Sequence, residues 1–114
     1  MAIQRLIICL ATVFILMIIG CDRQAKVARS NQIMGDSIVK ALDHYQKDIG
    51  EYPNSLADLV PKYLDRIKQP EGCSKGWIYE RTNAAEFYLT FEGDGSAWSG
   101  TLHSGRREWI IDDK

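Results

Sequence analysis

The chain has 114 residues, with 14 Lys and Arg against 15 Asp and Glu and a formal net charge of −1 at pH 7. Because its basic residues are scattered and do not outnumber the acidic ones, the composition excludes the basic footprint of a nucleic-acid-binding protein. The length suits one small domain, and 46% of the residues are hydrophobic and available for its core.

The chain opens with an apolar run. Arg5 gives the N-terminus a short positive start, and Leu6–Ile19 is apolar apart from Thr12. As a helix, this run would reach about 21 Å, which is short of the roughly 30 Å hydrocarbon core of a bilayer. The length is typical of the apolar region of a signal peptide. The alternative is an uncleaved membrane anchor with residues 22–24 as its polar flank.

The end of this run resembles the lipobox of bacterial lipoproteins. The sequence at positions 16–21 is Leu-Met-Ile-Ile-Gly-Cys, with an aliphatic residue three places before the cysteine and Gly20 directly before it. The resemblance implies that residues 1–20 are a lipoprotein signal peptide and that Cys21 is the site of lipid attachment. It also implies that residues 21–29 form a lipidated tether. A type IV prepilin leader does not fit, because its cleavage site precedes the apolar helix.

Processing at Cys21 would define the mature protein. Removal of residues 1–20 leaves 94 residues, and Arg5 is the only charged residue lost, so 13 basic residues remain against 15 acidic ones. Cys9 leaves with the signal peptide and Cys21 carries lipid, so Cys73 has no partner for an intramolecular disulfide. Asp22 directly after Cys21 resembles the inner-membrane retention signal of enteric lipoproteins. We therefore expect a lipid-anchored protein at the periplasmic face, with the inner membrane favoured.

Helical periodicity follows the tether. One face carries apolar residues at helical spacing: Met34, Ile38, Ala41, Leu42, Tyr45 and Ile49. Gly50 then supplies the left-handed residue with which helices commonly end. The pattern predicts a helix from about Val27 to Ile49. Asp36 and Asp43 should face water, with Asp43 paired to Lys47.

A short second helix is predicted after the extended Tyr52-Pro53 step. Ser55 is a good N-cap and Asp58 stands three residues further on. The helix Leu56–Val60 then meets Pro61. An apolar patch that could fold back on the first helix comprises Leu56, Leu59, Val60, Tyr63 and Leu64.

Residues 38–56 resemble the region that follows the long helix in type II secretion pseudopilins. The shared pattern is Ala-Leu at 41–42, then Tyr45, Asp48, Gly50, Tyr52-Pro53 and Leu56. The resemblance implies that residues 30–114 form a pseudopilin-head-like α+β domain. Pseudopilins keep their hydrophobic N-terminal helix for assembly, whereas lipoprotein processing would remove it here. The resemblance therefore supports the fold of the head and not a place in a filament.

The pattern changes from helical to strand spacing after the loop 69–76. Alternation with a period of two predicts four short strands, at 77–80, 87–91, 97–102 and 107–111, joined by turns at 93–96 and 103–105. We expect an α+β architecture, with one long N-terminal helix packed on a four-stranded antiparallel meander. The sheet face toward the helix should carry Trp77, Phe87, Leu89, Phe91, Trp98, Leu102, Trp109 and Ile111.

No catalytic constellation stands out among the polar residues. His44 and Asp48 are one helical turn apart and could supply two metal ligands, but a histidine on a polar helix face is more often solvated. His103 and Ser104 are adjacent in a turn, which rarely gives hydrolase geometry. The acidic residues near the C-terminus lack EF-hand spacing, so calcium is not predicted at Asp94, Ser96, Asp112 and Asp113.

Two further groups have alternative interpretations. Cys73 could be a reactive thiol, an intermolecular bridge or a packed residue, and it has no His close in sequence. Aromatic residues on strands could bind sugar or peptide, but at period two they are more often core. Exposure of Trp77, Trp98 or Trp109 beside a groove would favour binding.

These observations predict a small membrane-tethered envelope lipoprotein that acts as a non-enzymatic protein-interaction module, linked to secretion by the pseudopilin resemblance. The expected partners are the membrane, through the lipid anchor, and an envelope protein. No nucleic acid, cofactor or metal is expected. The alternative is a periplasmic inhibitor or immunity lipoprotein that blocks an enzyme or toxin. A third hypothesis is a metal- or thiol-dependent enzyme that uses His44, His103 or Cys73.

Overall fold

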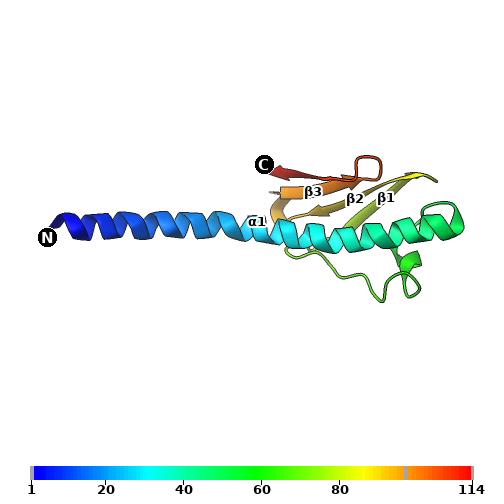
Figure 1. Cartoon of the computed structure of the whole chain (residues 1–114), viewed down its shortest axis with the longest axis horizontal. Coiled ribbons are helices and arrows are strands. Elements are labelled where there is room, and N and C mark those ends of the chain that lie inside the picture. The colour runs from blue at the N-terminus through cyan, green and yellow to red at the C-terminus, as the bar shows by residue number, and fades with distance from the viewer. Residues whose placement is uncertain (1, 97, 114) are drawn as a thin grey trace.

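The protein consists of a long helix and a four-stranded sheet that covers only part of it (Figure 1). The computed structural model describes the backbone of residues 2–96 and 98–113 and the side chains of residues 25–95 and 98–112. Helix α1 (Ala2–Ile49) runs the length of a molecule that measures 73 × 26 × 22 Å. The second half of α1 lies across the sheet, whereas its first half extends beyond the sheet (Figure 1).

The predicted helix is confirmed at its end, Ile49, but it begins much earlier than Val27. Between the apolar run and Val27 stand Gly20 and Cys21, followed by Asp-Arg-Gln-Ala-Lys. The stretch has no Pro, a single Gly is tolerated within a helix, and Arg, Gln, Ala and Lys are strong helix formers. Nothing in this stretch therefore ends the helix, and the residues predicted as a tether are helical. The side chain of Cys21 lies outside the described side chains, so signal-peptide removal and lipid attachment stay predictions. Among the described residues, no helix is long and apolar enough to cross a membrane.

Helix α1 ends and the chain reverses as the sequence predicted. Gly50 has φ 97°, and its N–H donates to the Gln46 carbonyl at 2.7 Å. The next helix is the 3-10 turn η1 (Leu56–Leu59), where the Ser55 hydroxyl accepts from the Ala57 N–H at 3.2 Å. The Ser55 cap is thus confirmed. Leu59 is fully buried, but Val60 is exposed, because the helix stops before it.

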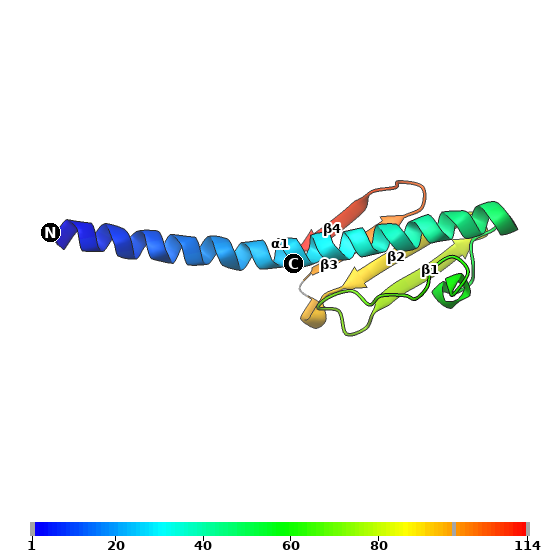
Figure 2. The same cartoon turned by 60° about the horizontal axis from the view of Figure 1, so that its bottom comes forward.

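The sheet is an antiparallel meander in the order β1-β2-β3-β4 (Figure 2). Its strands are β1 (Trp77–Asn83), β2 (Glu86–Glu92), β3 (Trp98–His103) and β4 (Trp109–Asp113). A short 3-10 turn, η2 (Asp94–Ser96), joins β2 to β3. The predicted α+β class, the four strands and their connectivity are confirmed.

The core lies between the second half of α1 and one face of the sheet. Its buried members are Ile38, Val39, Ala41, Leu42, Tyr52, Leu59, Phe87, Leu89 and Leu102. Phe91 is also fully buried and packs against the rings of Trp77, Trp98 and Trp109. At Gly35 the rings of Trp109 and Trp77 approach α1 so closely that a Cβ would collide with Trp109. The helix can therefore lie close to the sheet only because position 35 has no side chain.

Two residues predicted on the buried face are exposed. Ile49 is 56% exposed because it is the last residue of α1, and Ile111 is 41% exposed. Ile111 has the expected orientation, since it pairs with Gly100 opposite Phe91. However, β4 is an edge strand, so no neighbouring strand covers Ile111 on its outer side.

Candidate functional site

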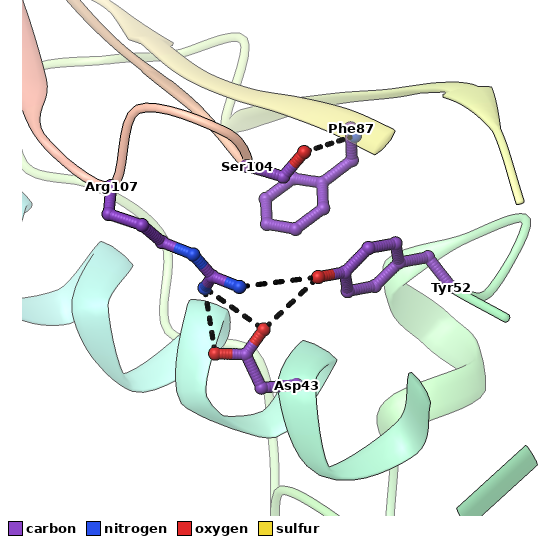
Figure 3. A network of polar contacts seen from close by, with 5 residues as sticks. All are labelled: Asp43, Tyr52, Phe87, Ser104 and Arg107. Atoms are coloured by element: carbon purple, nitrogen blue, oxygen red, sulfur yellow. Dashed lines mark hydrogen bonds and ion pairs between the residues drawn. The ribbon is translucent and has the colours of Figure 1, made fainter. Parts of the chain in front are cut away.

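A polar network joins the β3–β4 loop to α1 (Figure 3). The Arg107 guanidinium donates through Nη1 to both Asp43 oxygens, at 3.0 and 2.8 Å, and through Nη2 to the Tyr52 hydroxyl at 3.5 Å. Tyr52 in turn donates to Asp43 Oδ1 at 3.3 Å. These contacts fasten three segments together, so Asp43, which was predicted to pair with Lys47 and face water, here accepts from Arg107 and Tyr52.

The network raises the pKa of two of its members, Arg107 and Tyr52. The hydrogen bond to Asp43 raises the pKa of Arg107 further above its usual value. Burial, followed by the Asp43 charge, raises the pKa of the Tyr52 phenol. Both residues therefore keep their neutral-pH protonation states. The Arg107 and Asp43 side chains are each about half exposed. Solvent therefore screens the ion pair, and it stabilises the fold less than a buried pair would. The network is structural, and sequence reasoning missed it because 64 residues separate the two charges.

The adjacent His103 and Ser104 point to opposite sides of the sheet. The buried Ser104 hydroxyl accepts from the Phe87 N–H at 3.1 Å (Figure 3), and its own N–H donates to the Phe87 carbonyl at 3.0 Å. The His103 ring stacks on Tyr88, with ring centroids 4.6 Å apart, and its Nδ1 accepts from Gly105. The structure does not bring this serine and histidine together as a nucleophile and base.

His44 and Asp48 both lie at the exposed side of α1. Asp48 accepts a hydrogen bond from the Tyr63 hydroxyl at 2.9 Å, so this carboxylate holds the segment after η1 against the helix. In the part of the chain with described side chains, no three His, Cys, Asp or Glu residues are grouped as metal ligands.

Cys73 is a packed thiol in a loop that a buried asparagine holds in place. Asn31 on α1 is completely buried; its amide donates to the Glu71 carbonyl at 2.9 Å and accepts from the Glu71 N–H at 2.8 Å. The Cys73 thiol donates to the same carbonyl at 3.4 Å. Burial, and then the nearby Asp94 and Glu92 charges, raise its pKa. A cysteine nucleophile needs the opposite shift.

The Asp94 carboxylate accepts two hydrogen bonds from Ser74. Its Oδ1 accepts from the Ser74 N–H at 2.8 Å and from the Ser74 hydroxyl at 2.6 Å. These hydrogen bonds lower the pKa of the Asp94 carboxyl. They also tie the loop before β1 to the β2–β3 turn. The side chains of Ser96 and Asp113, which were weighed with Asp94 as calcium ligands, lie outside the described residues.

The three tryptophans are half-buried parts of the helix–sheet contact. Trp77 Nε1 donates to the Lys68 carbonyl, and Trp109 Nε1 donates to Asp36 on α1, at 2.7 and 2.8 Å. Trp98 packs its ring edge against Phe91. None of the three is exposed beside a groove, so their positions favour packing over ligand binding.

A shallow groove of about 530 Å³ runs between α1 and the segment after η1. Ile33, which is 62% exposed, and Met34 supply part of its apolar floor. Asp65, Arg66 and Lys68 supply charges of both signs. The groove thus has no convergent set of polar groups that would orient a small ligand.

The more distinctive surface is the sheet face that points away from α1, which we call the outer face. One row crosses all four strands in register: Ile78, Thr90, Thr101 and Ile110. Ile78 and Ile110 are 39% and 49% exposed, and the neighbouring Tyr88 is 41% exposed. Antiparallel sheets commonly alternate apolar residues inward with polar residues outward, so large apolar side chains at these positions are unusual.

The outer face also carries four acidic residues of the strands. These residues alternate along the strands with the inward-facing residues: Glu80, Glu86, Glu92 and Asp112. The strands contain a single Lys or Arg, Arg81, which is on the inner face and contacts Asn54 and Glu51, and one histidine, His103, which packs against Tyr88 on the outer face. The outer face therefore combines a row of two threonines between two isoleucines with negative charge. Sequence reasoning assigned the inner face correctly but did not consider the opposite set of residues.

No family model, no curated protein and no solved structure matches this chain.

Proposed function

We propose that the chain is a small envelope lipoprotein whose α+β head serves as a non-enzymatic protein-interaction module. Lipid on Cys21 would hold it at the periplasmic face of a membrane, with the inner membrane favoured by Asp22. The observation that carries the proposal is the outer face, where three large hydrophobic side chains, Ile78, Tyr88 and Ile110, stand exposed. Exposed apolar surface of this kind is typical of contact sites for other macromolecules.

The uses of the polar residues support this proposal. Asp43, Asp48 and Asp94 accept structural hydrogen bonds from Arg107, Tyr63 and Ser74 respectively. Ser104 is committed to the backbone of β2. Side chains that enzymes would use for acid–base or nucleophilic chemistry are here part of the folded framework.

The lipobox-like sequence and the pseudopilin-like segment supply the cellular setting. Acyl chains on Cys21 would keep the head close to the bilayer, where its partners would be other envelope proteins. The resemblance of residues 38–56 to type II secretion pseudopilins links the proposed partner to secretion.

Lipid attachment is tested by metabolic labelling with an alkyne-bearing fatty acid, followed by membrane fractionation. We expect the native chain to be labelled and membrane-bound, and Cys21→Ala to be unlabelled. Cys73→Ser is the matched control, because it removes the other cysteine of the mature chain and should leave the label in place. Mass spectrometry that shows an intact leader, or an unmodified sulfur at position 21, would contradict the anchor.

The interaction function is tested separately, by photo-crosslinking from exposed positions of the head in the cell. We expect adducts with at least one envelope protein. If probes on both the outer face and the α1 groove give no protein adduct, the head is not an interaction module.

A further inference from the structure

We infer that the outer face docks a protein segment that presents aliphatic side chains flanked by Lys or Arg. This inference rests on the proposed interaction function and specifies the surface and the chemistry of the partner. It depends on two features of the outer face, the row of isoleucines and threonines that crosses it and its charge.

The row consists of two threonines on the central strands between two isoleucines on the edge strands. Ile78 pairs with Thr90, Thr90 with Thr101 and Thr101 with Ile110, so the four side chains cross the sheet at the same level. The Thr90 and Thr101 hydroxyls are 3.1 Å apart and hydrogen-bond to each other. One hydroxyl donates to the other, so an aliphatic partner that covers the row leaves one hydroxyl proton of this pair, and not two, to be paired.

Acidic residues stand on both sides of this row. On one side of the row, Glu80 pairs with Tyr88, and Tyr88 pairs with His103. On the other side of the row, Glu92 pairs with Ser99, and Ser99 pairs with Asp112. Lys75 approaches Glu92 at 3.6 Å and offsets part of this charge. The strands place no Lys or Arg on this face, although the chain as a whole has nearly equal numbers of both signs.

Charge complementarity selects among the candidate occupants. An anionic bilayer surface attracts basic segments and would be repelled by this face. A second copy docked face to face would bring two acidic surfaces together, which like-charge repulsion opposes. A partner with Lys or Arg around an aliphatic centre satisfies both features, because it buries Ile78 and Ile110 and opposes the acids at the rim.

The test uses the full chain in the cell that produces it. A photo-crosslinking phenylalanine analogue at position 110 reports on the outer face, and the same analogue at position 33 reports on the α1 groove. The position-110 probe is combined with Glu80→Lys and Asp112→Lys. The matched control combines it with Asp58→Lys and Asp65→Lys, which reverse two exposed acids outside the sheet. Crosslinked residues on the partner are mapped by mass spectrometry.

We expect an adduct from position 110 that maps to a segment with aliphatic residues and Lys or Arg. The outer-face reversal should lower its yield by about tenfold, since like charges across an interface are strongly unfavourable, while the control reversal leaves it unchanged. Exchange of the mapped Lys or Arg for Glu in the partner should restore the adduct with the reversed chain.

Other results overturn the inference. These are no adduct from position 110, an adduct with lipid or with a second copy, a mapped segment without basic residues, or equal loss in the control. If position 33 gives a protein adduct while position 110 gives none, the interaction function stands and the outer face is not its site. If neither position does, both proposals fail.

Discussion

The two faces of the sheet differ in what their side chains do. On the inner face, Phe87, Leu89 and Phe91 of β2 are fully buried against α1 and its neighbours. On the outer face, Tyr88 of the same strand is 41% exposed, and Ile78 and Ile110 of the edge strands stand in a similar environment. Because successive residues of one strand alternate between these faces, the same strand contributes to the core and to an uncovered surface.

This difference separates residues that stabilise the fold from residues available for function. Burial of an aromatic side chain contributes a few kcal/mol, whereas exposed side chains contribute little to stability. If the outer face is a contact surface, substitutions there should alter binding and leave folding intact. Substitutions on the inner face should instead lower the stability of the fold without acting on the contact surface directly.

The largest effect is expected for Phe91→Ala. Phe91 is fully buried among three tryptophan rings, so its truncation should leave a cavity and lower the free energy of unfolding by about 3–5 kcal/mol. Tyr88→Ala is the matched control, since it removes an aromatic ring from the same strand on the outer face. Urea unfolding followed by tryptophan fluorescence measures both. Equal losses would show that the two faces do not differ as described.

The next effect concerns Tyr79, whose hydroxyl donates to the Pro53 carbonyl at 2.7 Å on the inner face. Burial raises the pKa of this phenol from 10.0 to about 12. Between these two values the unfolded chain releases the phenolic proton while the folded chain keeps it. Stability should therefore fall as the pH rises from about 10 to about 12.

Tyr79→Phe tests this assignment. It should cost about 1 kcal/mol at neutral pH, the typical net worth of one hydrogen bond, and should reduce the alkaline loss of stability. Tyr88→Phe on the outer face serves as the control and should leave the alkaline loss in place. An unchanged pH dependence in Tyr79→Phe would show that this phenol does not stay protonated in the fold.

Much of the fold could be predicted because it depends on local signals. Apolar spacing marked the buried face of α1 through Ile38 and Leu42, Gly50 marked its end, and alternation marked β2. The start of α1 could not be predicted from the apolar periodicity, because residues 22–26 are helical but have polar side chains apart from Ala25. Ile111 was assigned to the correct face, but its exposure depends on the position of β4 at the edge of the sheet.

The polar contacts between distant segments were not predictable from the sequence. The pairing of Asp43 with Arg107 depends on where the β3–β4 loop lies once the sheet has formed, and the same is true of Asn31 with Glu71. The outer face was missed for a different reason. Its residues follow from the predicted strand alternation, but whether anything covers them is a property of the complete fold.

A smaller effect is expected for the ion pair between Asp43 and Arg107. Both side chains are about half exposed, so the coupling energy from a double-mutant cycle with Asp43→Asn and Arg107→Gln should be about 0.2–1 kcal/mol. Added salt should reduce it further. A coupling of several kcal/mol would mean that this exposed network is as important to stability as the inner face.

The smallest effect is expected for the double substitution Ile78→Thr and Ile110→Thr. Both positions are exposed on strands, and threonine suits strands well, so the free energy of unfolding should change by less than about 0.5 kcal/mol per site. Urea unfolding of the variant provides the measurement. A larger loss would mean that the two isoleucines pack within the fold and are not available to a partner. If stability is unchanged, any loss of partner binding in the variant must come from the contact itself, because the folded population is the same.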